Sequence, residues 1–137
     1  MRSRRVVLIV GVFISLVAFV VAIMMYNKPH TNVEATEPAY TISAINLYTA
    51  FNDNETEANK KYLGKILEVD GVVVSVDTAD TGEIILDIDG NGVGYVRAWL
   101  SPDMQETITL NTTLTVKGIC TGMLLDVILN DCVLVEN

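Results

Sequence analysis

The chain has 137 residues, half of them hydrophobic, with 9 basic and 17 acidic residues and a formal net charge of −8. Residues 27–137 hold 6 basic and all 17 acidic residues, a net charge of −11 (6 minus 17). A domain this acidic is unsuited to gripping a phosphate backbone, because nonspecific nucleic-acid affinity comes mainly from Lys and Arg.

An apolar segment opens the chain. Val6–Met25 is a run of 20 residues without a charge or a proline. As a helix that rises 1.5 Å per residue it would be about 30 Å long, which is the thickness of the hydrocarbon layer. Three arginines precede the run and only Lys28 and His30 follow closely. The positive-inside rule therefore predicts a cytoplasmic N-terminus.

These features predict a single-pass protein of the inner membrane. We expect a cytoplasmic tip, a transmembrane signal anchor, a linker and a periplasmic domain at residues 1–5, 6–26, 27–39 and 40–137. The alternative is a cleaved signal peptide with a weak site at Val20-x-Ala22, but the run exceeds the usual apolar region of about 7–15 residues. No cysteine directly follows the run, which excludes a lipoprotein anchor. In either case residues 27–137 lie outside the cytoplasm.

Two short helices are predicted ahead of the strands. The first opens at Tyr40–Ser43, where Thr41 or Ser43 can cap it, and its apolar positions at helical spacing are Ile45, Leu47 or Tyr48, and Phe51. The second covers Glu55–Tyr62, with Gly64 as its C-cap.

From Lys65 the apolar period changes to two, which indicates strands. The first strand holds Gly71, where a strand can bulge or bend. One hairpin is expected around Gly90-Asn91-Gly92 and a second near Gly122. Ser101-Pro102-Asp103 is expected to start a short helical turn, because proline is favoured at the first helical position. The five predicted strands are Ile66–Val76, Glu83–Ile88, Val93–Leu100, Thr112–Ile119 and Leu124–Val135.

This order of elements predicts a mainly β protein with short helices. We expect a five-stranded OB-fold Greek-key barrel, preceded by one or two short helices and an N-terminal transmembrane helix. The alternative is an open antiparallel sheet covered by the leading helices.

The chain from Tyr40 to Cys132 resembles the tRNA-anticodon-binding-like OB-fold family of small exported bacterial proteins. The resemblance rests on three segments: residues 59–73 (NKKYLGKILEVDGVV), 116–122 (VKGICTG) and 126–132 (DVILNDC). Residues 26–30 (YNKPH) look like those of membrane-tethered versions from Bacteroidetes. The resemblance implies the fold and the location but no catalytic residue. One departure is Ala98, where many relatives have a cysteine.

Tyr95, Arg97 and Trp99 share one face of the third strand, because they alternate with apolar residues. An OB-fold binds ligands on the outer face of its second and third strands. A three-residue turn would place Asp87 near Tyr95 and Ile85 near Arg97. Glu83 and Asp89 share this phase of the second strand with Asp87, and such acidic neighbours oppose a phosphate strand and suit a sugar, a peptide or a cationic ligand. The alternative is that Trp99 packs and Arg97 pairs with a carboxylate.

Asp87-Ile88-Asp89-Gly90-Asn91-Gly92 matches the first half of a calcium loop. The twelfth position is Ala98 rather than a bidentate Glu, and strands flank the segment where an EF-hand has helices. The stronger interpretation is a β-hairpin turn. We therefore expect no metal and no cofactor.

Cys120 and Cys132 lie in an oxidising compartment if the topology is correct, so a disulfide is permitted. If Gly122 marks the turn, the two Cα atoms are much farther apart than the limit of about 7 Å for a bridge. The presence of both cysteines in the resembling family argues for the bond, and both alternatives stay open. With no CxxC motif and the only histidine, His30, in the linker, we expect no enzyme activity.

The leading functional hypothesis is a binding module that engages an envelope protein, a peptide or a glycan through the face of Tyr95, Arg97 and Trp99. The second is a structural or assembly protein without a small ligand. The third, a single-stranded nucleic-acid binder, follows only from analogy of fold and is opposed by the negative charge.

Overall fold

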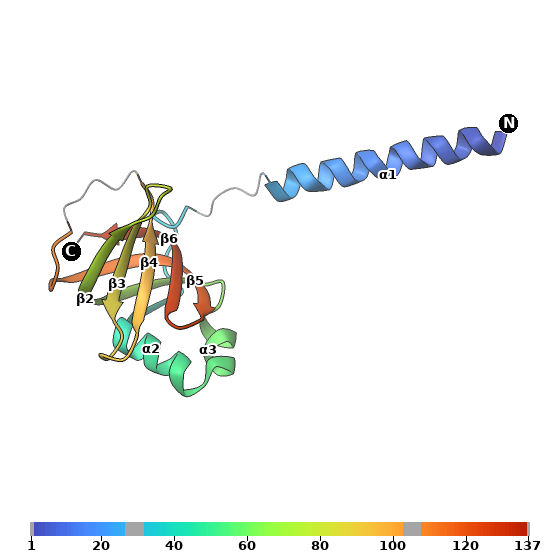
Figure 1. Ribbon diagram of the computed structural model, residues 1–137. Coiled ribbons are helices and arrows are strands. Elements are labelled where there is room, and N and C mark those ends of the chain that lie inside the picture. Colours follow the sequence, from blue (N-terminus) through green and yellow to red (C-terminus); the bar gives the residue numbers. More distant parts are fainter. Residues whose placement is uncertain (1, 27–31, 103–107, 137) are drawn as a thin grey trace. The chain divides into compact units, whose positions relative to one another are not determined.

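The computed structural model describes residues 2–26, 32–102 and 108–136, and the chain divides into two compact units, Met1–Thr31 and Asn32–Asn137. The first unit holds helix α1 (Arg2–Tyr26), whose side chains are described for residues 11–23 (Figure 1). Within the described part of the chain, no helix is both long and apolar enough to cross a membrane.

The second unit is a closed β-barrel with two helices at one end (Figure 1). Its strands follow the order β1-β2-β3-β4-β6-β5, and an additional pairing of β5 with β2 closes a ring of five. The barrel confirms the mainly β part of the prediction, a closed barrel of five strands with short helices, and excludes the open sheet. The strands are β1 (Tyr40–Ser43), β2 (Ile66–Thr78), β3 (Ile84–Asp89), β4 (Tyr95–Leu100), β5 (Thr113–Met123) and β6 (Val127–Val135).

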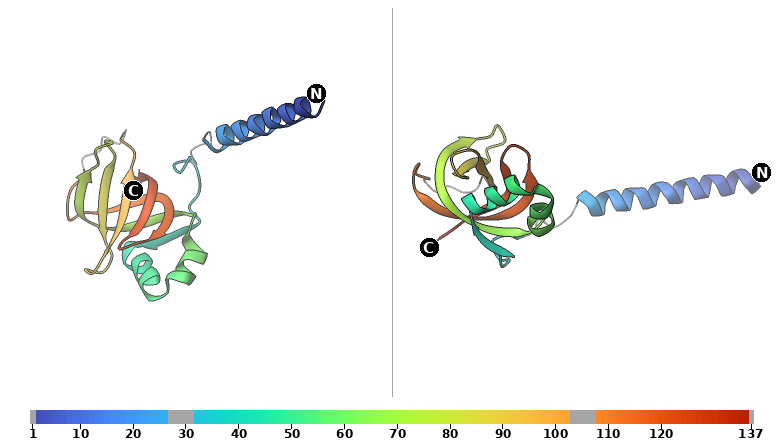
Figure 2. Two further views of the ribbon diagram at one scale, coloured as in Figure 1. Left: turned by 45° about the vertical axis from the view of Figure 1, so that its right-hand side comes forward. Right: turned by 90° about the horizontal axis from the view of Figure 1, so that it is seen from below.

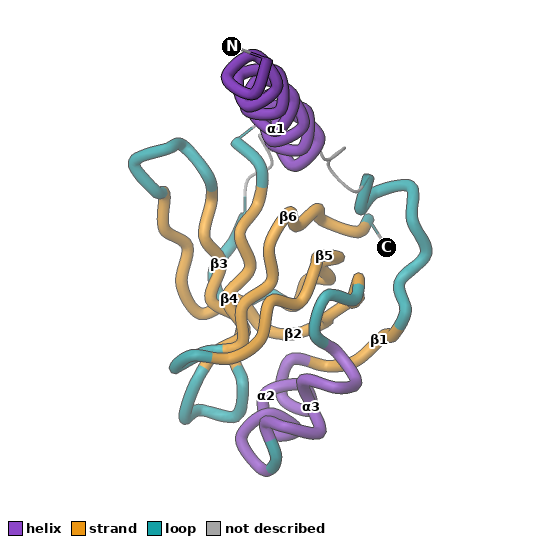
Figure 3. The backbone as a smooth tube through the Cα atoms, turned by 90° about the vertical axis from the view of Figure 1, so that its right-hand side faces the viewer, coloured by secondary structure: helices purple, strands orange, loops and turns teal. Residues whose placement is uncertain are grey.

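Strand β1 was not predicted. Tyr40–Ser43 was expected to open a helix, but it pairs in parallel with Leu67–Asp70 of β2 (Figure 3). Helix α2 (Ala44–Asp53) begins directly after it, and the Ser43 hydroxyl accepts a hydrogen bond from the N–H of Asn46 at 3.3 Å. Ser43 is therefore the N-cap, and the four residues up to it are extended because they add a strand to β2.

Strand β2 pairs with different strands along the two halves of its length. Residues 66–72 pair antiparallel with β5, whereas residues 73–78 pair with β3, with a register shift between Val73 and Ser75. Gly71 lies before this bulge, where Ile88 and Ala44 approach it closely: a Cβ at position 71 would lie 2.5 Å from Cγ2 of Ile88. The glycine predicted to permit a bend thus permits close packing of α2 and β3 on β2.

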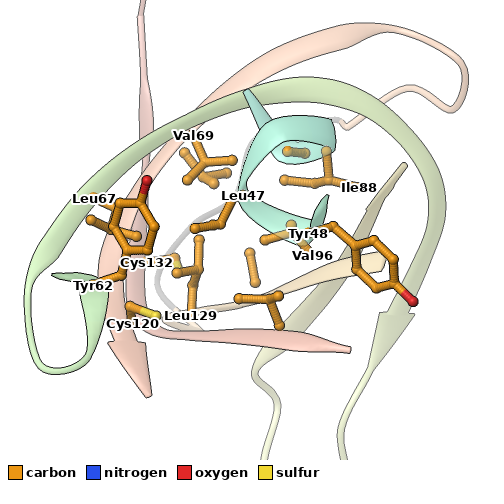
Figure 4. Packing of buried hydrophobic residues seen from close by; sticks show 14 of the residues in the cluster. Leu47, Tyr48, Tyr62, Leu67, Val69, Ile88, Val96, Cys120, Leu129 and Cys132 are labelled. Atoms are coloured by element: carbon orange, nitrogen blue, oxygen red, sulfur yellow. The ribbon is translucent and has the colours of Figure 1, made fainter. Parts of the chain in front are cut away.

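The hydrophobic core fills the barrel and is closed at one end by helix α2. Seen from below, α2 lies across the mouth of the barrel (Figure 2). Its buried residues are Ala44, Leu47, Tyr48 and Phe51, and Leu47 points into the centre of the core (Figure 4). Helix α3 (Glu55–Tyr62) adds Ala58 and Tyr62. Every residue of the core cluster lies after Ile42, so the second unit carries its own complete core.

The last hairpin turns later than expected. Gly122 (φ 105°) lies within β5 at a register shift, and residues 124–126 form the turn before β6. The positive φ of this glycine marks a bulge rather than the turn itself. The helical turn expected from Ser101 to Asp103 cannot be followed, because residues 103–107 lie outside the described part of the chain; Pro102 lies in a turn.

Candidate functional site

Alternate residues of β4 form the outer face of the barrel at the predicted site. Tyr95 is 40% exposed, the Arg97 side chain is 38% exposed, and Trp99 is half-buried, whereas the residues between them point into the core. The structure therefore brings the three predicted site residues together on one face, as the alternation of the sequence indicated.

Arg97 is held by two carboxylates. Its Nε donates to Oδ1 of Asp87 at 2.7 Å and its Nη2 donates to Oδ2 at 3.1 Å. Nη2 also lies 3.5 Å from Oδ2 of Asp126. The hydrogen bonds to Asp87 are the main cause that raises the pKa of Arg97. This bidentate pair occupies the guanidinium fork, so the fork is already engaged where a phosphate would need it.

The register of the β3–β4 hairpin differs from the predicted one. Asp87 lies opposite Arg97 rather than Tyr95, and Ile85 lies opposite Trp99 rather than Arg97. The turn spans residues 90–94 and is closed by the N–H of Gly90, which donates to the carbonyl of Gly94 at 2.9 Å. The predicted register was therefore wrong by two residues along β4.

Tyr48 of α2 packs against this turn. A Cβ at Gly94 would clash with the Tyr48 ring, and a Cβ at Gly90 would lie 2.9 Å from that ring's Cβ and Cγ. Two glycines are therefore required where the turn meets the helix. This contact joins segments more than 40 residues apart (90 minus 48 is 42), and no local pattern indicates it.

Asp126 is a site residue that sequence reasoning missed. Its Oδ1 accepts a hydrogen bond from the N–H of Tyr95 at 3.0 Å, and its Oδ2 faces Arg97. The side chain is only 17% exposed. The available signal in the sequence was that Asp126 is a single acidic residue between the apolar Leu125 and Val127, shortly after Gly122. Asp126 fixes the β5–β6 turn to the first residue of β4.

The residues of the half calcium motif have other partners. Asp87 pairs with Arg97, and Oδ1 of Asp89 accepts a hydrogen bond from the N–H of Gly92 at 2.8 Å, as in a capped turn. Asn91 has a φ of 100° within that turn. In residues 32–102 and 108–136 no group of three or more His, Cys, Asp or Glu is placed to hold a metal ion.

The face around Arg97 is acidic at its edges and apolar between them. Besides Asp87 and Asp126, the carboxylate of Asp77 on β2 acts on Arg97, and Asp89 on β3 lies opposite Tyr95. Four acidic residues and one cation therefore share this face. Ile85 of β3 lies beside Trp99. On the other side of β4, Ile128 of β6 lies beside Arg97. The arrangement offers aromatic and aliphatic surface with a net charge of −3 (1 minus 4).

Cys120 and Cys132 are both free thiols, buried inside the barrel (Figure 4). Cys120 pairs with Leu129, and the Sγ of Cys132 lies over Gly118. The two cysteines are thus diagonal neighbours, at about 7–8 Å between Cα atoms for such positions. The much larger separation expected from a turn at Gly122 was wrong because the turn lies at residues 124–126.

Burial makes both thiols poor nucleophiles. It raises the pKa of the Cys120 thiol, and it raises the pKa of Cys132 to about 12. Because the thiolate is the reactive form, neither side chain is suited to attack a substrate at neutral pH.

A comparison with solved structures finds 51 chains that match, one of them a proposed nucleic acid-binding lipoprotein from Klebsiella pneumoniae subsp. pneumoniae MGH 78578. Its TM-score is 0.60 at 17% identity, and the match covers 80% of this chain and 100% of that one. At this identity the likeness shows the fold alone. No curated protein matches the chain. The sequence profile of the tRNA_anti-like family matches residues 1–133. The chain therefore belongs to the tRNA_anti-like family, as its resemblance indicated.

Proposed function

We propose that this protein is a membrane-anchored binding module outside the cytoplasm, which engages an envelope protein, a peptide or a glycan through the outer face of β4. The observation that carries the proposal is the arrangement of Tyr95 and Trp99 on either side of an arginine whose charge is already neutralised. Partly exposed aromatic rings are typical anchors of binding sites, because they bury much apolar area with few rotatable bonds.

The charge of the face selects the class of ligand. Asp87 and Asp126 already form ion pairs with Arg97. The remaining carboxylates of this face repel a phosphate backbone. Residues 32–137 carry 5 basic and 17 acidic groups, a net charge of −12 (5 minus 17). A neutral or cationic ligand fits this surface, whereas a nucleic acid would have to overcome both the local and the overall charge.

A second candidate function is a structural or assembly role without a small ligand. The ion pair of Arg97 with Asp87 and the half-buried position of Trp99 favour it, because that hypothesis requires these side chains to be paired or packed. Both candidates are non-enzymatic. The buried thiols, with Cys132 at a pKa of about 12, support that proposal.

We also propose that α1 is an uncleaved signal anchor of the inner membrane. Its 20 uncharged residues from Val6 to Met25 and the three arginines before them support a cytoplasmic N-terminus and a periplasmic domain. The native protein should remain in the membrane pellet after alkaline carbonate extraction, with its N-terminal residues intact by mass spectrometry. Release into the supernatant, or a mass that lacks residues 1–22, would contradict the anchor.

The ligand face can be tested through Trp99, the only tryptophan. Its emission should change on titration with a neutral oligosaccharide or a lysine-containing peptide. Tyr95→Ala should weaken that binding by about 30-fold, the effect of removing an aromatic hot spot of about 2 kcal/mol. Tyr40→Ala is the matched control, because Tyr40 is 39% exposed against 40% for Tyr95 but lies on β1.

Three outcomes separate the hypotheses. A saturable change that Tyr95→Ala weakens and Tyr40→Ala does not is the expected result. A salt-sensitive complex with a deoxythymidine oligonucleotide would replace the proposal with nucleic-acid binding. Trp99 emission that acrylamide does not quench in the native protein would mean that the ring is inaccessible, which leaves the structural role.

A further inference from the structure

Tyr95 lies between two carboxylates on the outer face of the barrel. Strands β3, β4 and β6 are neighbours in the sheet (Figure 1), and Asp89 of β3 lies directly opposite Tyr95. On the other side, β6 begins with Val127, which lies opposite Val96. Asp126 directly precedes Val127, and its Oδ1 accepts a hydrogen bond from the N–H of Tyr95 at 3.0 Å. Adjacent strands are about 4.8 Å apart, so each aspartate is about one strand spacing from Tyr95.

The neighbouring pair of carboxylates on this face shows which kind of group lies between them. Arg97, two residues along β4, has Asp87 of β3 at 2.7 Å and Asp126 at 3.5 Å, so a guanidinium lies between those two carboxylates. Tyr95 has a carboxylate on each side as well, but among the described residues no Lys or Arg other than Arg97 forms an ion pair with Asp89 or Asp126. The position over the Tyr95 ring is thus suited to a cation that the described part of the chain does not supply.

Both aspartates beside Tyr95 are held in place and keep acceptor capacity. Oδ1 of Asp89 accepts a hydrogen bond from the N–H of Gly92 at 2.8 Å, but among the hydrogen bonds of residues 32–102 and 108–136 none involves its Oδ2. Oδ2 of Asp126 lies 3.5 Å from Arg97, beyond the usual length of about 2.7–2.9 Å for a charged hydrogen bond. The Tyr95 ring is 40% exposed, and the face of such a ring attracts a cation. An ammonium or guanidinium over this ring would therefore gain a cation–π contact and two carboxylate partners.

The length of the face distinguishes a peptide from a smaller ligand. Trp99 lies four residues along β4 from Tyr95, which is about 13 Å at about 3.3 Å per residue. Ile85 lies opposite Trp99, so an apolar side chain can pack at this end of the face. An extended peptide has the same rise per residue, and its side chains four positions apart point to the same side. One such peptide reaches both rings, whereas a free amine reaches only one.

We propose that the ligand of this face is an extended peptide segment with a Lys or Arg and an apolar residue four positions apart. The basic side chain lies over Tyr95 between the two aspartates, and the apolar one packs on Trp99. The inference rests on the ligand face proposed above and narrows its ligand to a basic peptide. Asp89 is then the residue that determines specificity, because its carboxylate forms no ion pair within the described part of the chain.

The test compares two peptides on the full chain in a nonionic detergent. The first is GKSGSLG, with a neutral dye at its N-terminus and an amide at its C-terminus, so that its lysine and leucine are four positions apart. The second carries Nε-acetyl-lysine in place of the lysine. In titrations followed by fluorescence anisotropy, acetylation should weaken binding about tenfold, the combined effect of a cation–π contact and two exposed ion pairs. Free cadaverine should compete about tenfold less well than the unlabelled lysine peptide, because it lacks the contact with Trp99.

Asp89→Asn tests the assigned partner of the lysine. Asparagine keeps an oxygen for the N–H of Gly92, so the turn is retained while the charge is removed. We expect this variant to bind the lysine peptide about threefold more weakly, the effect of one exposed ion pair, and to bind the acetylated peptide unchanged. Asp80→Asn is the matched control, because it removes the same charge from the exposed turn that precedes β3, whereas Asp89 ends that strand.

Three results would overturn the inference: equal binding of the two peptides, equal competition by cadaverine, or equal losses in Asp89→Asn and Asp80→Asn. In each of them the lysine peptide still binds, so the ligand face of Tyr95 and Trp99 stands and only its assigned specificity is wrong. Binding of neither peptide also overturns the inference. That result counts against the ligand face itself only if the oligosaccharide titration of Trp99 shows no change either.

Discussion

Gly118→Ala is the substitution that tests most directly how β6 lies on β5. A Cβ at position 118 would come closer than 3.0 Å to Sγ of Cys132 and would lie 3.2 Å from the carbonyl oxygen of Asn130. Overpacking of this kind costs about 1–3 kcal/mol. Alanine also lowers the conformational entropy of the unfolded chain, which offsets about 0.4–1 kcal/mol of that cost. We therefore expect a net loss of about 1–2 kcal/mol of unfolding free energy.

Cys132→Ala should remove the clash and thereby reverse most of this loss. Alone, it deletes one buried sulfur and leaves a cavity, which costs about 1 kcal/mol or slightly more. If the two effects simply added, the double variant would lose about 2–3 kcal/mol. Because the new methyl group occupies the space that Sγ vacates, we expect the double variant to lose no more than about 1 kcal/mol. The expected coupling is thus about 1–2 kcal/mol in favour of the double variant.

The assay is urea unfolding of residues 32–137, followed by circular dichroism, since this unit holds the whole core. Cys120→Ala is the matched control: Cys120 is also fully buried on β5, but its atoms are not among the three nearest to the Gly118 Cβ. Its combination with Gly118→Ala should be additive within about 0.5 kcal/mol. Additivity of the Cys132 pair as well would refute the register of β6 described above.

Three further changes test other parts of the structure. Ser43→Ala should cost about 1 kcal/mol in urea unfolding by removing the α2 cap, whereas the exposed Thr41→Ala should cost less than about 0.5 kcal/mol; equal losses would contradict the capping role. The unfolded Cys132 thiol loses its proton near pH 9 and the folded thiol only near pH 12. The contribution of Cys132 should therefore be intact below pH 9 and fall above it by about 1.4 kcal/mol per pH unit. Cys132→Ala should make the measured slope shallower, and the buried Cys120, whose pKa is also raised, should account for part of what remains. Arg97→Met should lower the free energy of unfolding by about 1–2 kcal/mol, less than the loss of a fully buried ion pair, because solvent screens the half-exposed guanidinium. Asp87→Asn in the same chain should recover part of that loss. An unchanged urea midpoint for Arg97→Met would show that the ion pair does not stabilise the fold.

Much of the barrel could be predicted because its strands follow a local rule. The alternation of Tyr95, Arg97 and Trp99 with apolar residues determines which side chains face outward, whatever the neighbouring strands do. Helix α3 carried its own signals as well: Asn54 is its N-cap, and Gly64 (φ 73°), the predicted C-cap, lies one residue after the observed C-cap, Leu63.

The parts that could not be predicted depend on distant contacts. Tyr40–Ser43 has the composition of a helix start and becomes a strand because β2 offers it a partner edge. The predicted hairpin register was wrong, and its turn packs against Tyr48, a residue of α2 that no local pattern connects with it. Asp126 belongs to the site only because β6 runs parallel to β4, which brings the β5–β6 turn beside Tyr95. Tertiary contacts override local signals at each of these points.

The double pairing of β2 has a consequence for the order in which the protein folds. Its second half can pair early with β3, its neighbour along the chain, but Ile66 in its first half meets Ile119, 53 residues later (119 minus 66). β6 must in turn reach back to β4, where Val127 meets Val96. Closure of the ring therefore waits for almost the entire chain, and contacts this distant fold on a timescale of about milliseconds to seconds. A chain that emerges N-terminus first leaves the β5-facing edge of β2 without its partner until residue 119 is free, so a chaperone or a protease has its best opportunity in that interval.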